Sequence, residues 1–201
     1  MTAEAVIVKM TPSSLPDWVF PPPQGFVAED LDRIPDLPAH TELIDGSLVF
    51  VSPQANFHML AVSLLEAELR RAAPANLRVR REMSVILDRD QRPEPDLCVV
   101  AADAVEGRRQ TFFEARDVSL VVEVVSPESQ TRDRQRKPSL YARAAIPHFW
   151  RFEDQSDKLV VYVYELDPAT KCYVPTGIHH DRLKLTVPFD VDIDLTTIDR
   201  M

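Results

Sequence analysis

The chain has 201 residues, enough for one domain with a substantial hydrophobic core and a separate arm. Its hydrophobic fraction of 45% and charged fraction of 27% are those of a globular protein, and no apolar run approaches the roughly 20 residues that a membrane span requires. The formal net charge of −9 gives no support to a nucleic-acid partner, so such a partner would depend on local basic clusters.

The N-terminus does not show the charged and then apolar layout of a signal peptide. The two cysteines, Cys98 and Cys172, lie in strand-like segments without the spacing of a metal site. We therefore expect both to be reduced core thiols of a cytoplasmic protein without a membrane anchor.

Residues 1–37 are expected to form a proline-rich N-terminal arm, with the folded domain over residues 38–201. Prolines recur along the arm and prevent long regular elements. A short helix is expected over residues 28–34, with acidic side chains in its first turn. The arm needs a surface to pack against, which either the domain or a second copy of the chain in a homodimer would provide.

Residues 41–51 predict a β-hairpin, because two apolar runs flank Asp45-Gly46. This dipeptide favours a tight turn that requires positive φ angles. A Ser-Pro pair ends the second strand. Asn56 is then expected to cap a helix that runs to about Ala72, with apolar residues at helical spacing.

The next part of the chain predicts a second antiparallel pair. Residues 78–87 alternate between apolar and charged side chains, as in a half-buried strand. Residues 88–92 form a polar turn, and residues 96–100 form a short apolar strand that begins with an acid. Residues 101–117 are expected to be a charged, irregular connection.

Residues 120–127 are an almost unbroken run of valine and leucine, interrupted by Glu123 and ended by Pro127. Such a run is typical of a strand that is buried on both faces. A buried carboxylate is costly unless a cation or several hydrogen bonds satisfy it. Glu123 is therefore either a paired core acid or a metal ligand, and this run alone leaves both interpretations open.

A helix is expected after this run, ending near Ala145. Asp133, Lys137 and Tyr141 are spaced by four residues, so they share one face of it. Pro138 would break a helix that begins near Asp133, but it would sit harmlessly in the first turn of a helix that begins near Lys137. Three more strands are expected, over residues 148–153, 158–166 and 171–176.

Three acids lie in or beside apolar strands: Glu42, Asp96 and Glu123. If the strands of Asp96 and Glu123 are neighbours, the two carboxylates can converge on one divalent cation, and oxygen ligands with open water positions suit Mg²⁺ or Mn²⁺. Lys137 could orient or deprotonate water, or neutralise charge on a phosphate. Taken singly, each acid is more simply explained as a turn residue or as the partner of a core arginine.

Other residues carry weaker signals. Two basic clusters, over residues 70–81 and 132–137, could contact DNA, although solvated element faces explain them as well. His58 is expected to be structural, or to contact an anion near a helix N-terminus. Tyr141 and Trp150 are expected to be core aromatics. The chain shows no nucleophile elbow, phosphate-cradling loop or zinc spacing.

The order and spacing of several motifs resemble those of the Uma family, endonuclease-like bacterial proteins placed in the PD-(D/E)XK nuclease superfamily. The resemblance covers most of the chain, from about Gly25 onwards. It rests on the following motifs: Glu42-Leu43-Ile44-Asp45-Gly46, Ser52-Pro53 followed by His58, Pro95-Asp96, Val122-Glu123-Val124-Val125-Ser126-Pro127, and Asp133 with Lys137, Tyr141 and Trp150.

The resemblance implies an α/β restriction-endonuclease-like fold, with a mixed central sheet flanked by helices and a divalent-metal nuclease site at one sheet edge. Asp96 matches the acid of the Pro-Asp motif, and Glu123 matches the acid of the (D/E)XK motif. The superfamily lysine would fall at Val125, but Lys137 matches a position from which the Uma family supplies a lysine. Glu42 matches an additional acid.

Two positions depart from the family pattern. Ala145 stands where the family usually has glycine, and Pro138 adjoins the matching lysine, where it would shift a helix that contained it.

The sequence thus predicts a Mg²⁺- or Mn²⁺-dependent DNA endonuclease, in which Asp96 and Glu123 hold the metal and Glu42 and Lys137 complete the catalytic set. The alternative is a catalytically inactive nuclease-fold module for binding or assembly, which the acidic balance and the displaced lysine favour. A third reading is metal-dependent hydrolysis of a smaller phosphate ester.

Overall fold

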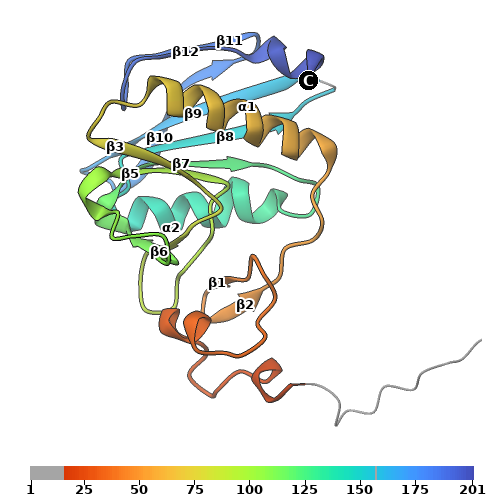
Figure 1. Cartoon of the computed structure of the whole chain (residues 1–201), viewed down its shortest axis with the longest axis vertical. Helices are drawn as coiled ribbons and strands as arrows, with labels where there is room; N and C mark the ends of the chain where they lie inside the picture. The colour runs from red at the N-terminus through yellow and green to blue at the C-terminus, as the bar shows by residue number, and fades with distance from the viewer. Residues whose placement is uncertain (1–15, 157) are drawn as a thin grey trace, which may run out of the picture.

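A six-stranded mixed sheet forms the centre of the computed structural model, which describes residues 16–156 and 158–201 (Figure 1). The strand order is β10-β9-β8-β7-β5-β3; β7 and β8 run parallel, and the other neighbouring pairs are antiparallel. The strands are β3 (Leu77–Arg81), β5 (Leu97–Ala101), β7 (Val118–Val124), β8 (His148–Asp154), β9 (Leu159–Asp167) and β10 (Cys172–His179). The mixed α/β architecture expected from the sequence is confirmed.

One helix covers each face of this sheet, α1 (Asn56–Ala72) on one side and α2 (Lys137–Arg143) on the other (Figure 1). The valine-rich run forms β7, whose side chains alternate between the two faces. Val122 and Val124 pack in the cluster that includes α1, whereas Val121 packs with Tyr141 of α2. Strand β7 is therefore buried on both faces, as its sequence predicts. None of the helices in the described parts of the chain has the length and apolar character of a membrane span.

Three two-stranded pairs surround the central sheet, of which β1 (Glu42–Ile44) and β2 (Ser47–Val49) form the predicted hairpin. Asp45 and Gly46 have φ angles of 52° and 68°, the positive values that this turn requires. The other two pairs are β4 (Ser84–Ile86) with β6 (Phe112–Glu114), and β11 (Arg182–Leu185) with β12 (Val191–Asp194).

The structure corrects the prediction of one strand over residues 78–87. Glu82 adopts a φ of 51°, so the chain breaks there into β3 and β4. Strand β3 pairs with β5 as expected, whereas β4 pairs in parallel with β6, inside the connection that was expected to be irregular. The alternation is interrupted at Arg80-Arg81-Glu82, three charged residues in a row, but the apolar face resumes at Met83, so the pattern was interpreted as one strand.

Smaller corrections concern caps and burial. The segment expected to be helical over residues 28–34 is a 3₁₀ turn over Ala28–Asp32. Helix α1 begins at Asn56, so its N-cap residue is Ala55 and not Asn56 as predicted. Both cysteines are free; Cys98 is buried as predicted, whereas Cys172, which begins β10 at the sheet edge, is exposed.

The segment before α2 shows how the chain accommodates Pro138. Residues Arg132–Arg136 form a π-helical turn, in which the Lys137 N–H donates to the carbonyl of Arg132, five residues back. Helix α2 follows directly, and Pro138 lies in its first turn, inside a helical segment that is continuous from the π-turn. Each alternative for this proline is therefore correct in part: the helical segment includes Asp133 and is distorted into a π-turn, and its α-helical part begins at Lys137.

Ala145, at the position where a glycine is usual in the Uma family, lies two residues after the end of α2 and has a φ of 60°. A side chain at this left-handed conformation is strained, so Ala145→Gly should raise the free energy of unfolding by about 1 kcal/mol. The neighbouring Ala144, with a φ of −77°, provides the control, because Ala144→Gly should lower stability. Urea denaturation would measure both, and a destabilised Ala145→Gly variant would contradict the explanation.

The end of the proline-rich arm lies against the β1–β2 hairpin. Phe26 and Ala28 are buried and form a small cluster with Leu43 of β1. The amide of Phe26 also donates to the carbonyl of Gly46 in the hairpin turn. Residues 1–15 lie outside the described part of the chain, and both the domain boundary at residue 37 and the homodimer stay predictions.

Candidate active site

Asp96 and Glu123 lie beside each other at one end of the central sheet. Asp96 immediately precedes β5, and Glu123 is the penultimate residue of β7. These strands are antiparallel neighbours, and Leu97 is opposite Val122, so the next pair outward is Asp96 with Glu123. The Asp96 Oδ2 atom accepts a hydrogen bond of 2.6 Å from the amide of Val124, which fixes this carboxylate against β7.

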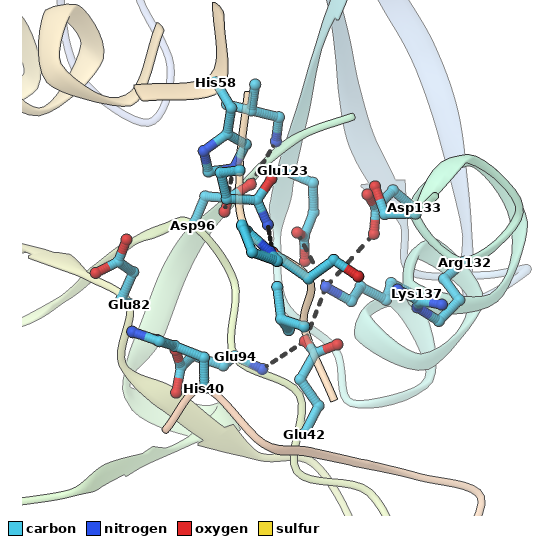
Figure 2. A pocket seen from close by; sticks show the side chains of 16 residues that line it. His40, Glu42, His58, Glu82, Glu94, Asp96, Glu123, Arg132, Asp133 and Lys137 are labelled. Carbon is cyan, nitrogen blue, oxygen red and sulfur yellow. Dashed lines mark hydrogen bonds and ion pairs between the residues drawn. The ribbon is translucent and has the colours of Figure 1, made fainter. Parts of the chain in front are cut away.

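Lys137 connects three of the neighbouring carboxylates. Its Nζ atom lies 2.8 Å from Glu42 Oε1, 3.1 Å from Glu123 Oε2 and 3.4 Å from Asp133 Oδ1. Figure 2 shows the lysine reaching from its helix to the middle of these three acids. The Tyr141 hydroxyl donates to the other Glu123 oxygen at 2.5 Å. Glu123 is thus a paired acid, with the buried Lys137 on one oxygen and the buried Tyr141 on the other.

The spacing of four residues explains why Asp133, Lys137 and Tyr141 meet in one place. The π-helical turn and α2 are continuous, so these side chains project from the same side towards Glu123. The same arrangement explains how the site has an amine although Val125 stands at the position of the superfamily lysine. This residue is apolar and its amide donates to Phe152, so the amine beside Glu123 comes from α2 instead.

The four predicted site residues line a single cavity of about 350 Å³ (Figure 2). His58, in the first turn of α1, bonds through its Nε2 to Asp96 Oδ1 at 2.8 Å. The cavity is lined by His40, Glu42, Val51, Ser52, Pro53, Gln54, His58, Glu82, Glu94, Asp96, Glu123, Val124, Ser129, Arg132, Asp133 and Lys137. The structure therefore brings together all four residues that the sequence singles out.

Four further residues belong to this site but were not assigned to it from the sequence. Tyr141 is a buried aromatic as predicted, but its hydroxyl contacts Glu123. His58 supports Asp96, and Asp133 contacts Lys137. Arg132 lines the cavity, and its Nε atom has no hydrogen-bond partner among the described residues. Helical spacing already linked two of these residues to Lys137, whereas no pattern linked His58 to Asp96.

The site holds more acidic than basic groups in a buried setting. Burial raises the pKa of Glu123 well above its usual range; Lys137 opposes this rise, and the carboxylates of Asp133, Asp96 and Glu42 add to it. Burial likewise raises the pKa of Asp133. Burial alone would lower the pKa of Lys137, but the surrounding acids hold it well above its usual value. The lysine is therefore charged, and it faces an excess of carboxylates.

This excess predicts a pH dependence of stability. A buried acid whose pKa is raised binds its proton more tightly in the folded protein, so its contribution is full below about pH 4.3 and falls as the pH rises through the raised value. The free energy of unfolding should therefore decrease above about pH 4.3, by up to about 1.4 kcal/mol per pH unit for Glu123.

The Glu123→Gln variant isolates this contribution. It keeps the size of the side chain and the other titrating groups. The difference in free energy of unfolding between the wild type and the variant should therefore change as the pH rises above about 4.3. Urea unfolding of the metal-free proteins between pH 4 and pH 8, with ~1 unit steps, would measure it. Parallel curves for the wild type and the variant would contradict the assignment.

The donor set suits a hard divalent cation. Asp96 and Glu123 offer carboxylate oxygens, each of which can accept more than one contact, and the surplus negative charge favours a cation. Within residues 16–156 and 158–201, no group of three or more His, Cys, Asp and Glu side chains is placed to hold a metal alone. A bound Mg²⁺ would therefore rely on two carboxylates and water, as Mg²⁺ commonly does.

Comparison with known proteins decides the family. The family model Uma2, described as "Putative restriction endonuclease", matches residues 28–197. The chain belongs to this family. The resemblance stated from the sequence is thereby confirmed for this Uma2 protein. A search of curated proteins finds no match.

A solved structure from Anabaena variabilis is similar to this Uma2 protein. It is described as "a putative nuclease belonging to DUF820", and the two chains share 14% sequence identity at a TM-score of 0.57. The match covers 81% of this chain and 89% of that one. At this identity the likeness shows the fold, which confirms the expected nuclease-type architecture.

Proposed function

We propose that this Uma2 protein is a divalent-metal-dependent DNA endonuclease that hydrolyses phosphodiester bonds. The observation that carries the proposal is the arrangement of Asp96, Glu123 and Lys137, with the lysine ammonium 3.1 Å from Glu123 in the same cavity. Two acids and one lysine at the edge of a nuclease-type sheet are the groups that this reaction requires. The family membership supports the same conclusion.

Asp96 and Glu123 are the residues that would hold Mg²⁺ or Mn²⁺. When bound, such a cation polarises the phosphate and lowers the pKa of a coordinated water. The amide of Val124 and the His58 ring orient Asp96, and Tyr141 orients Glu123. These contacts fix both carboxylates before substrate arrives, which lowers the cost of assembling the site.

Lys137 would stabilise the charge that develops on the phosphate. Its raised pKa keeps the amine protonated at neutral pH, so it is suited to donate hydrogen bonds and unsuited to deprotonate water. Glu42 holds it in place: its Oε1 accepts both from Lys137 and from the amide of Glu94. Arg132 supplies a second cation at the cavity wall.

The direct test is nicking of supercoiled plasmid by the purified protein. Nicking with Mg²⁺ or Mn²⁺, abolished by a chelator, is the expected result. Absence of nicking together with absence of Mn²⁺ binding in calorimetry would instead support the inactive nuclease-fold module. Competition by free nucleotides against DNA would test the smaller phosphate ester as substrate. The cytoplasmic location stays a prediction from the sequence.

A further inference from the structure

A second cavity, of about 480 Å³, opens between α2 and the strands β8, β9 and β10. Its volume falls within the range of small-ligand sites. The lining residues are Arg134, Pro138, Ser139, Ala142, Arg143, Phe149, Arg151, Tyr164, Thr170, Lys171, Cys172 and Tyr173. They include four cations and three aromatic rings but no carboxylate, in a chain whose net charge is −9.

Two of the four cations are partly neutralised by a carboxylate of the protein, that of Glu153. Arg134 forms a two-pronged hydrogen bond to Glu153, at 3.0 and 2.7 Å, and Arg151 lies 2.7 Å from the same carboxylate. For Arg143 and Lys171, no carboxylate of the described residues lies within ion-pair distance. Both are exposed at the rim of the cavity; Arg143 also lines a neighbouring cavity with Asp45, Asp88 and Asp90, whereas Lys171 lines this cavity alone.

The floor of this cavity is aromatic. Phe149 stacks on Tyr164 with ring centroids 5.4 Å apart, and its centroid lies 5.5 Å from that of Tyr173. The Tyr173 hydroxyl donates to the carbonyl of Ile146, which fixes the ring. The Arg151 guanidinium lies over the rings of Tyr162 and Tyr164. Phe149 is fully buried, so the rings that face the cavity are those of the half-buried Tyr164 and Tyr173. With cations around them, these rings fit a base and its phosphate.

The second cavity is also next to the candidate active site. Glu123 and Arg151 are register partners on the parallel strands β7 and β8, so their side chains point from the same sheet face one strand apart. On the π-helical turn, Arg132 lines the first cavity and Arg134, two residues later, lines the second. One polynucleotide strand could therefore contact both cavities.

We propose that this second cavity is a subsite that binds one nucleotide of a polynucleotide, beside the bond that is cleaved. The base stacks on the aromatic floor, and Arg143 and Lys171 contact the phosphate. That the bound nucleotide belongs to the polymer that is cleaved rests on the proposed endonuclease function. Nucleotide binding in the cavity does not depend on it.

Charge reversal at the rim tests the subsite. Binding of a short fluorescein-labelled single-stranded oligodeoxynucleotide would be followed by fluorescence anisotropy with chelator present, so that no cleavage occurs. Arg143→Glu and Lys171→Glu should each weaken binding about tenfold and reduce its salt dependence. Lys184→Glu, the same charge change on β11, should leave binding unchanged. Equal affinities for all three variants, or no binding by the wild type, would overturn the subsite.

Cys172 gives a second readout that needs no substitution at the rim. It is exposed and lines the cavity, whereas Cys98 is buried and its pKa is raised to about 12 by burial, so a thiol reagent should modify Cys172 alone. The Cys172→Ser variant verifies that assignment. The oligonucleotide should slow this modification severalfold, and protection by free deoxyadenosine monophosphate as well would show that one nucleotide suffices. Modification at the same rate with either ligand would overturn the proposal.

The two proposals fail separately. Plasmid nicking with unchanged affinity in Arg143→Glu would overturn the subsite alone. Loss of oligonucleotide binding in that variant, with no metal-dependent nicking by the wild type, would overturn the endonuclease alone.

Discussion

Replacing Asp96 with asparagine should lower the rate of Mg²⁺-supported plasmid nicking by about 10²–10³-fold, the usual effect of removing one preorganised electrostatic contact from an active site. Both oxygens of Asp96 are engaged, one by the Val124 amide and one by His58. Asparagine keeps the size of the side chain and can still accept the Val124 hydrogen bond. It loses the negative charge that would hold the cation.

Because the fold does not depend on that charge, the melting temperature of the metal-free Asp96→Asn protein should stay close to that of the wild type. The variant should bind Mn²⁺ more weakly in calorimetry, so activity and metal affinity should fall together. A joint fall in activity and metal affinity at an unchanged melting temperature distinguishes a lost metal ligand from a general loss of structure.

Asp103→Asn provides the matched control, since Asp103 is an exposed acid in the turn that follows the other end of β5. That variant should nick plasmid at the wild-type rate. Full activity in Asp96→Asn would remove this residue from the catalytic set. Equal losses in both variants would indicate a general effect of removing a negative charge and not the loss of a specific metal ligand.

The central sheet could be predicted because its strands carry strong, simple signals. The run of valine and leucine around Glu123 is too long and too apolar for an exposed segment, and it became β7, buried on both faces. Asp45-Gly46 specified a tight turn through its φ angles alone. Such signals depend on local chemistry, which a single sequence displays directly.

The failures have a different physical origin. The pairing of β4 with β6 joins two short segments far apart in the chain, and neither has a pattern that specifies its partner. The positive φ of Glu82 depends on its surroundings rather than on its own preference. The contact of His58 with Asp96 likewise follows from tertiary packing, because α1 and β5 are distant in sequence.

Around the candidate site, the most useful sequence signal was the spacing of Asp133, Lys137 and Tyr141. It held because the chain remains helical through the π-turn and into α2. Because of Pro138, the sequence did not determine where the helix begins. The structure shows this through the hydrogen bond from the Lys137 N–H to the carbonyl of Arg132. The proline does not remove Lys137 from the site, because it lies in the first turn of α2.

Lys137→Met should be the most damaging single change for stability, lowering the free energy of unfolding by about 3–5 kcal/mol at pH 8. Methionine fills a similar volume but leaves Glu42, Glu123 and Asp133 buried, at 2% exposure each, without their shared cation. Lys184→Met, an exposed lysine on β11, should change stability by less than about 0.5 kcal/mol and serves as the control. Urea denaturation would measure both variants.

Two conditions should reverse part of the loss in Lys137→Met. Because the pKa values of Glu123 and Asp133 are raised, lowering the pH from 8 to 5 favours protonation of these acids, so the difference from the wild type should shrink. Millimolar Mg²⁺ should raise the melting temperature of this variant more than that of the wild type, because the cation compensates the carboxylates that the lysine no longer neutralises. A loss that is independent of pH and Mg²⁺ would mean that Lys137 stabilises the fold through packing, and that the acids do not form a cation site.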